Sequence, residues 1–311
     1  SSKAHPDIWL HRYLRAASWD VERAFASVKS VVEWRAAEAL DVLNYEGEVG
    51  SGHDELRLGL SRLIGKDRLG FPLMYVKVRR IMPRLSEGFV FKRYLITIFE
   101  ATQTVTRSYG RSTMLYDFTG FSMDNTPFQM VHFMVFLGMK PYADTSSVLI
   151  LLVDNWLFTN FWSLIRPFLD VNLSSRIIFA KNVDEVKRFI DEDQIPVELG
   201  GRNTFSVEFV PPREGENALM FDMDGRRDAE KKWRQRVAAF EEATKEWCGQ
   251  LAASKMSSNS SLGLTDAAAL KRDAAAKELA DSEVNLSKYV RARNIYERLG
   301  MVDEEGSLKL P

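Results

Sequence analysis

The chain has 311 residues, 45% of them hydrophobic, and its 42 basic and 43 acidic side chains leave a formal net charge of −1 at pH 7. This balance excludes the overall basic excess typical of nucleic-acid-binding proteins, and no apolar run approaches the ~18 residues that cross a bilayer. The single cysteine, Cys248, excludes an intramolecular disulfide and indicates a reducing compartment, so we expect a cytoplasmic protein.

The N-terminal part of the sequence predicts two helices followed by a loop. Pro6 and Asp7 begin a helix that carries apolar residues from Ile8 to Leu14. Asp20 can cap a second helix, because an aspartate side chain accepts hydrogen bonds from the free backbone N–H groups of a first turn. Residues 44–55 contain three glycines and are typical of a loop.

The middle of the chain alternates between strand and helix patterns. Short runs rich in branched residues indicate buried strands, and apolar residues at helical spacing indicate helices. The expected strands are Leu73–Val78, Thr113–Phe118, Val148–Val153, Ile177–Ala180 and Phe205–Val210, and the expected helices are Phe89–Tyr109, Phe128–Leu137 and Val183–Ile190. This order predicts an α/β fold.

An aromatic helix is expected between the two most apolar strands. Five residues fall on one face at helical spacing: Phe158, Phe161, Trp162, Ile165 and Phe168. Such a stripe most often belongs to a hydrophobic core. The alternative is that it forms the wall of a ligand cavity.

The order of several motifs favours the cavity. Leu10-His-Arg-Tyr-Leu-Arg-Ala-Ala-Ser-Trp-Asp-Val21, Asp117-Phe-Thr-Gly120, Arg166-Pro-Phe-Leu-Asp170 and Gln194-Ile-Pro-Val-Glu-Leu-Gly-Gly201 occur in this order. Together they resemble the CRAL-TRIO lipid-binding family, of the type found in fungal phosphatidylinositol-transfer proteins. The resemblance implies an N-terminal helical domain at residues 1–55. It also implies a lipid-binding domain at residues 56–212, in which a mixed sheet flanked by helices encloses a lipid cavity.

The resemblance fades after residue 212, and we expect a helical extension at residues 213–311. Helical patterns cover Asp228–Leu251 and Thr265–Gly300, with a Ser-rich linker near residues 252–263. Asp222-Met-Asp224-Gly225 is similar to a phosphatase motif, but Arg226 stands where that motif has Thr or Ser. We interpret it as a polar turn before a helix.

No residue pattern indicates catalysis or a metal site. The four histidines are scattered without ligand spacing, and we find neither a nucleophile elbow nor a glycine-rich phosphate loop. We therefore expect no enzyme, no cofactor and no metal. A local basic cluster, Lys77, Arg79, Arg80, Arg84, Lys92 and Arg93, is either a solvated face or a contact with anionic lipid surfaces.

The resemblance also implies which residues hold the ligand. The positions that bind the phosphatidylinositol headgroup in the family map onto Asp144, Asp170 and Arg176, which keep the sign of each charge. Three other headgroup positions depart from the family pattern, as Thr145, Leu173 and Ala17. The expected gate helix and cavity wall comprise Phe158, Phe161, Trp162, Ile165, Phe168, Met114, Tyr116, Phe128, His132, Val148, Ile150 and Leu152.

Three functions remain open at this stage. The first is transfer of one phospholipid, with phosphatidylinositol as the leading ligand, by a monomer that is peripherally and transiently bound to a membrane surface. The second is a carrier of a neutral lipid such as a sterol or squalene, since the three departures make the site more apolar. The third is a scaffold or regulator that acts through the C-terminal helices.

Overall fold

Five strands form one mixed sheet within the described part of the chain, and they cross it in sequence order. The computed structural model describes residues 5–51, 56–57, 59–81, 88–122, 128–153, 157–205, 209–256, 264–303 and 308–309. The strands are β1 (Ser61–Lys66), β2 (Pro72–Lys77), β3 (Ser112–Asp117), β4 (Ser146–Leu152) and β5 (Ile177–Ala180). β1 is antiparallel to β2, whereas β2 to β5 are parallel and therefore need crossover connections.

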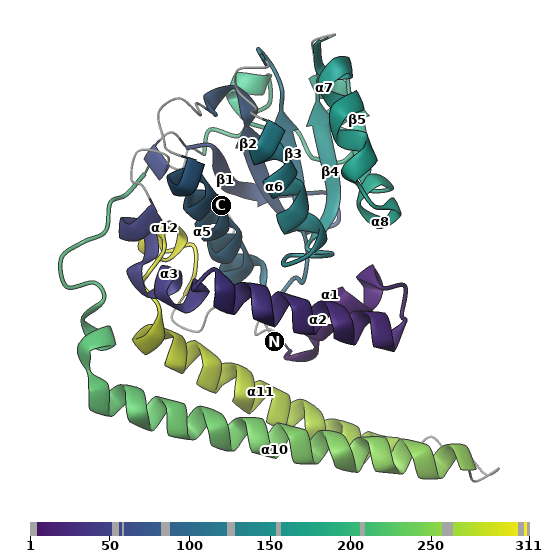
Figure 1. The fold of residues 1–311 in the computed structure, drawn as a ribbon, viewed down its shortest axis with the longest axis vertical. Coiled ribbons are helices and arrows are strands. Elements are labelled where there is room, and N and C mark those ends of the chain that lie inside the picture. The colour runs from purple at the N-terminus through teal and green to yellow at the C-terminus, as the bar shows by residue number, and fades with distance from the viewer. Residues whose placement is uncertain are drawn as a thin grey trace.

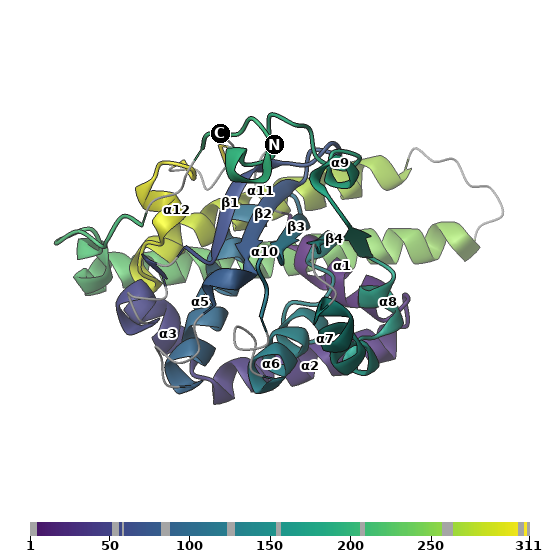
Figure 2. The same ribbon diagram turned by 90° about the horizontal axis from the view of Figure 1, so that it is seen from above.

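The helices of these crossovers cover one face of the sheet (Figures 1 and 2). The first is α5 (Gly88–Thr106), the second is α6 (Phe128–Met139), and the third contains α7 (Leu157–Ile165) and α8 (Val171–Ser174). A 3-10 turn with a proline at its start, Arg166–Phe168, separates α7 from α8. Parallel crossovers are almost always right-handed, which places consecutive ones on the same side of the sheet.

The opposite face is closed by a thin layer, α9 (Val183–Val186) and the segment that follows it (Figure 2). Val186, Ile190 and Ile195 are fully buried there against inward residues of the strands. Asp67 organises the turn between β1 and β2, because its side chain accepts hydrogen bonds from the backbone of Leu69 and Phe71 and from the Thr113 hydroxyl.

The N-terminal helices lie between this body and the C-terminal helices (Figure 1). They are α1 (Asp7–Ala16), α2 (Val21–Ala37) and α3 (Leu40–Glu46). Asp20 caps α2 by accepting a hydrogen bond from the Arg23 N–H at 3.0 Å. Glu100 of α5 fixes the helices to the body: it pairs with Arg35 at 2.8 and 2.9 Å and accepts a hydrogen bond from Asn44.

The C-terminal part is a long helical hairpin, α10 (Met223–Met256) and α11 (Leu264–Val290), followed by the short α12 (Ile295–Arg298) (Figure 1). α12 returns to the body, where the almost fully buried Arg298 guanidinium contacts Glu48 and Glu216. The backbone N–H of Ile295 also donates to Glu48 at 2.7 Å. The end of the chain is therefore tied to the segment that follows α3.

Most of the elements expected in the α/β part are confirmed, and β5 has the bounds that its sequence predicts. β1 was not expected. In the extension, α10 is longer than the predicted Asp228–Leu251 and extends into the predicted linker, while residues 257–263 lie outside the described residues. The predicted helix Thr265–Gly300 breaks between α11 and α12. Phe205, Phe209 and Val210 are not in a strand, and residues 206–208 lie outside the described part.

Candidate functional site

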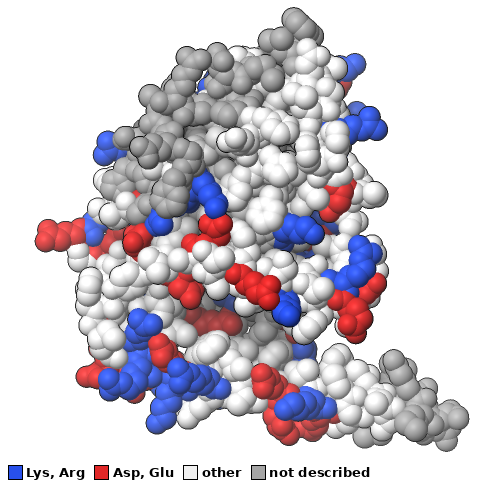
Figure 3. All heavy atoms as spheres, in the orientation of Figure 1, with Lys and Arg blue, Asp and Glu red and all other residues white. Residues whose placement is uncertain are grey.

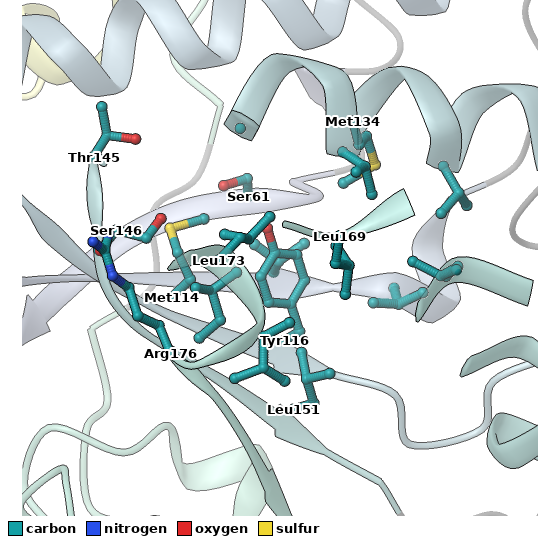
Figure 4. A pocket seen from close by; sticks show the side chains of 18 of the residues that line it. Ser61, Met114, Tyr116, Met134, Thr145, Ser146, Leu151, Leu169, Leu173 and Arg176 are labelled. Carbon is teal, nitrogen blue, oxygen red and sulfur yellow. The ribbon is translucent and has the colours of Figure 1, made fainter. Parts of the chain in front are cut away.

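A cavity of about 170 Å³ lies between the sheet and the layer formed by α5, α6 and α7. Its floor is made by inward residues of the strands, including Met114, Tyr116 and Leu151, and its roof includes Met134 of α6 (Figure 4). These side chains are mostly apolar. Burial raises the pKa of the Tyr116 phenol to about 12, so Tyr116 contributes a protonated hydroxyl to an otherwise apolar wall.

The strand β4 faces the cavity with the opposite set of residues from the one predicted. Leu149 and Leu151 line the cavity. Val148, Ile150 and Leu152 instead pack into the cluster on the far face of the sheet, so their placement in the cavity wall is corrected. The sequence could not decide between the two faces, because a parallel strand buried on both sides is apolar at every position.

The helix α7 closes one side of the cavity with aromatic rings. Phe158, Phe161, Trp162 and Ile165 all line it. Phe158 also packs on Phe118, with ring centroids 4.7 Å apart and nearly perpendicular planes. Such edge-to-face contacts favour a fixed arrangement of the rings, so this contact holds α7 against Phe118, the residue that follows β3.

Three predicted wall residues form a separate contact outside the cavity. Phe168 touches His132 and Phe128 of α6, with ring centroids 5.0 and 5.7 Å away. Phe128 and Phe168 are half exposed, and none of the three lines the cavity. This cluster links the turn after α7 to α6 at the surface.

Three arginines meet at one carboxylate at the polar end of the cavity. Asp144, whose side chain is 1% exposed, contacts Arg111 at 2.7 and 2.8 Å, Arg15 at 2.5 Å, and Arg176. Arg176 also donates to the Ser146 carbonyl at 3.0 Å (Figure 4). Asp144 and Arg176 line the cavity, while Arg15 comes from α1 and Arg111 immediately precedes β3. The backbone of Asp144 is left-handed, with φ of 58°.

The third predicted headgroup residue, Asp170, is in a different environment. It caps α8, accepting a hydrogen bond from the Leu173 N–H at 2.7 Å, and it is exposed. It does not line the cavity. The predicted trio is thus divided: Asp144 and Arg176 lie together, and Asp170 performs a local capping role.

Sequence reasoning missed Arg15 and Arg111. Arg15 belongs to the Leu-Arg pattern of the first helix, and Arg111 is a single basic residue in a turn. Neither position carries a local signal for a shared site, because only the docking of α1 against the segment around Asp144 brings them together.

A second hollow, of about 1070 Å³, separates the hairpin from the N-terminal helices (Figure 3). Its lining includes Trp9 and Trp233. Two pairs of charged side chains meet there, Arg35 with Glu100 and Arg107 with Glu283. Arg12 also lines this hollow and donates to Gln103.

Two features are absent from the described residues. No group of three or more His, Cys, Asp or Glu side chains in this part of the chain is arranged to hold a metal ion. Likewise, no helix among these residues has the length and apolar character needed to cross a membrane.

Comparison with known proteins places the same region in a family. A family model described as the CRAL/TRIO domain matches residues 56–201. A CRAL-TRIO domain-containing protein of Schizosaccharomyces pombe is 27% identical over 97% of this chain and 67% of its own length. The phosphatidylinositol transfer protein CSR1 of Eremothecium gossypii is 27% identical over 98% of this chain and 69% of its own length. The crystal structure of Sfh5 shares the fold, with a TM-score of 0.53 and 14% identity over 67% of this chain and 80% of that one.

Proposed function

We propose that this chain, whose residues 56–201 match the model of the CRAL/TRIO domain, binds a single lipid in the cavity above the sheet and exchanges it at membranes. The observation that carries the proposal is the division of the cavity into two chemical parts. Apolar side chains line most of it, and a cluster of arginines stands at one end. This division matches an amphiphile with hydrocarbon chains and an anionic head.

The energetics explain why such a cavity must be closed. Each methylene group moved from water into an apolar site contributes about 0.8 kcal/mol, so an acyl chain bound along its length is held strongly. Release is favourable only where a bilayer receives the chain. A volume of about 170 Å³ is below the 300–1,000 Å³ typical of ligand pockets, so loading requires α7 to move away from the sheet.

By likeness to a relative, phosphatidylinositol is the first candidate ligand, with Asp144 and Arg176 as headgroup residues. The support is the relative CSR1, which is named as a phosphatidylinositol transfer protein, and the cationic end of the cavity. A neutral lipid, such as a sterol or squalene, is the second candidate, and the apolar wall around Met114, Leu149 and Leu151 favours it.

We further propose that the protein works as a cytoplasmic monomer that visits membrane surfaces transiently. The working units are an N-terminal helical domain at residues 1–55, the lipid-binding domain at residues 56–212 and the helical extension at residues 213–311. The tie between α12 and Glu48 supports a structural role for the extension.

A cavity-filling substitution tests the proposal. Leu151→Trp places a large ring in the cavity floor, so lipid extracted from the purified variant and quantified by mass spectrometry should fall at least about tenfold relative to the native protein. Leu164→Trp on the exposed side of α7 is the matched control, because Leu164 is 48% exposed. Equal lipid content in native protein and both variants would refute binding in this cavity, and the identity of the extracted lipid separates a phospholipid from a sterol or squalene.

A further inference from the structure

The charge around Asp144 is not balanced. Arg15, Arg111 and Arg176 all contact this one carboxylate, and no other acidic side chain among the described residues pairs with any of the three. The cluster therefore has an excess of two positive charges. A partly buried excess of this kind is costly unless an anion neutralises it.

A fourth arginine adds to this excess. Arg12 lies one turn before Arg15 on α1 and is only 5% exposed. Its guanidinium donates to Gln103, which lines both the cavity and the second hollow, while Arg12 itself lines the second hollow. The Arg12 Nε atom is buried without a hydrogen-bond partner among the described residues.

The arginines of the cluster retain donors that Asp144 does not use. A guanidinium has five N–H donors. Arg15 reaches the carboxylate through Nε alone, and Arg111 does so through one terminal nitrogen, which leaves its buried Nε without a partner in the described structure. The side chains of Arg15, Arg111 and Arg176 are 29%, 28% and 19% exposed, whereas the Asp144 side chain beneath them is 1% exposed. Of the three arginines, Arg176 lines the cavity, so the head of a lipid in the cavity approaches the cluster at Arg176 while Asp144 holds the guanidiniums together.

Among the residues that the structure describes, no carboxylate near the cluster is free to accept hydrogen bonds from an inositol ring. Both Asp144 oxygens are engaged by arginines. The Asp170 carboxylate caps α8 outside the cavity lining. Hydroxyl groups of a polyol headgroup would find no free carboxylate here, whereas a phosphate would find several unused N–H donors.

We infer that this site selects lipids whose head is a phosphomonoester, such as phosphatidic acid, over phosphodiester lipids such as phosphatidylinositol. The inference rests on the proposed function, since it assumes that the cavity binds a lipid. A phosphomonoester carries about −1.5 to −2 charges near pH 7 and three terminal oxygens, which match the excess charge and the unused donors of the cluster. A phosphodiester has one negative charge and two terminal oxygens. Arginine pairs with such oxygens in a bidentate manner.

Competition between the two lipids tests the inference. The full chain is incubated with phosphatidylcholine vesicles that contain equal mole fractions of phosphatidic acid and phosphatidylinositol, reisolated, and analysed by native mass spectrometry. At about pH 8 we expect at least tenfold more bound phosphatidic acid than phosphatidylinositol. The ratio should fall toward one at about pH 5.5, because the second ionisation of a phosphomonoester lies near pH ~6 and arginines stay charged throughout this range.

Two variants locate the effect. Arg111→Gln removes one charge and should lower bound phosphatidic acid about tenfold with a smaller effect on phosphatidylinositol. Arg202→Gln is the matched control, because this side chain is 69% exposed and pairs with Glu192 away from the cluster. Circular dichroism and thermal melting verify that both variants fold. If Arg111→Gln does not fold, the pH series on the native protein decides the question.

The outcomes separate the two proposals. Bound phosphatidylinositol equal to or above phosphatidic acid at about pH 8 overturns the inference and leaves the proposed function intact. A preference for phosphatidic acid that does not change with pH also overturns it. If neither phospholipid loads and a neutral lipid does, the headgroup assignment fails, and if no lipid loads at all, the proposed function itself fails.

Discussion

Replacing Arg298 by methionine should destabilise the whole protein. The Arg298 side chain is 2% exposed, and its guanidinium contacts Glu48 and, at 3.1 Å, Glu216. It also donates to the backbone carbonyls of Val210 and Arg293, at 2.9 and 3.1 Å. Methionine keeps much of the side-chain volume but removes every one of these donors.

The expected cost follows from the two carboxylates left behind. Glu48 is 2% and Glu216 is 6% exposed, and removing one partner of a buried ion pair costs about 3–5 kcal/mol. With an unfolding entropy of about 2.1 cal/mol/K per residue, ~1 kcal/mol corresponds to about 1.5 °C in melting temperature for a chain of 311 residues. We therefore expect Arg298→Met to melt about 5–8 °C lower near pH 7.5.

The pH dependence gives an independent check. Burial raises the pKa of Glu48 above its usual 4.5, and Arg298 offsets this rise only in part. A carboxyl group whose pKa is raised in the folded state binds more protons there than in the unfolded chain, so stability increases as the pH falls through the folded pKa. Removing Arg298 raises that pKa further, so the deficit of the variant should shrink as the pH falls from about 7.5 to about 5.

Differential scanning fluorimetry at the two pH values measures both effects. Arg234→Met is the control, because Arg234 is 73% exposed and pairs with Glu230 at 3.4 Å, a surface contact that contributes at most about 1 kcal/mol. The reasoning is refuted if Arg298→Met and Arg234→Met have the same melting temperature near pH 7.5. It is also refuted if the difference in melting temperature between Arg298→Met and the native protein grows as the pH falls.

Two further substitutions address the gate and the docking of the N-terminal helices. Phe168→Ala removes the ring that touches Phe128 and His132. It should lower the free energy of unfolding by about 1 kcal/mol and speed the uptake of a fluorescent lipid, which stopped flow measures. Unchanged uptake contradicts a gating contact. Glu100→Gln should lower the free energy of unfolding by about 3 kcal/mol, because it breaks the buried ion pair with Arg35. Burial alone would raise the pKa of Glu100, but the hydrogen bonds led by Arg35 lower it below 4.5 overall, so its contribution is present above that value and lost as the pH falls through the folded pKa. Stability, followed by circular dichroism during acid unfolding, should therefore depend less on pH in the variant. An unchanged dependence on pH in the acid range would be evidence against this contribution.

The sequence located β2 to β5 but not the face of β4 that borders the cavity. β5 has the bounds that its apolar run predicts, and β4 was located to within two residues at its start. The choice between Ile150 and Leu151 as the cavity residue needed the structure, because both faces of the strand are buried. β1 was missed because Arg62 and Gly65 interrupt its pattern.

The site was only half predictable for a different reason. Asp144 and Arg176 follow from the resemblance, and the structure places them in contact. Arg15 and Arg111 reach them through tertiary docking between segments far apart in the chain, which leaves no local periodicity. Asp170 carried a competing signal, because an aspartate directly before the first residue of a helix is a common N-cap.

One hydrogen bond constrains how α7 could move as a gate helix. The Asn172 amide of α8 donates to the Ala16 carbonyl at the end of α1, at 2.8 Å. That bond fixes α8, which follows α7, to α1, a helix outside the layer that covers the sheet. An outward swing of α7 would then be a rotation about Leu169 and Asp170, while α8 stays in place. The opening would form on the side of α7 that is remote from the arginines, so the hydrocarbon tails would leave before the head.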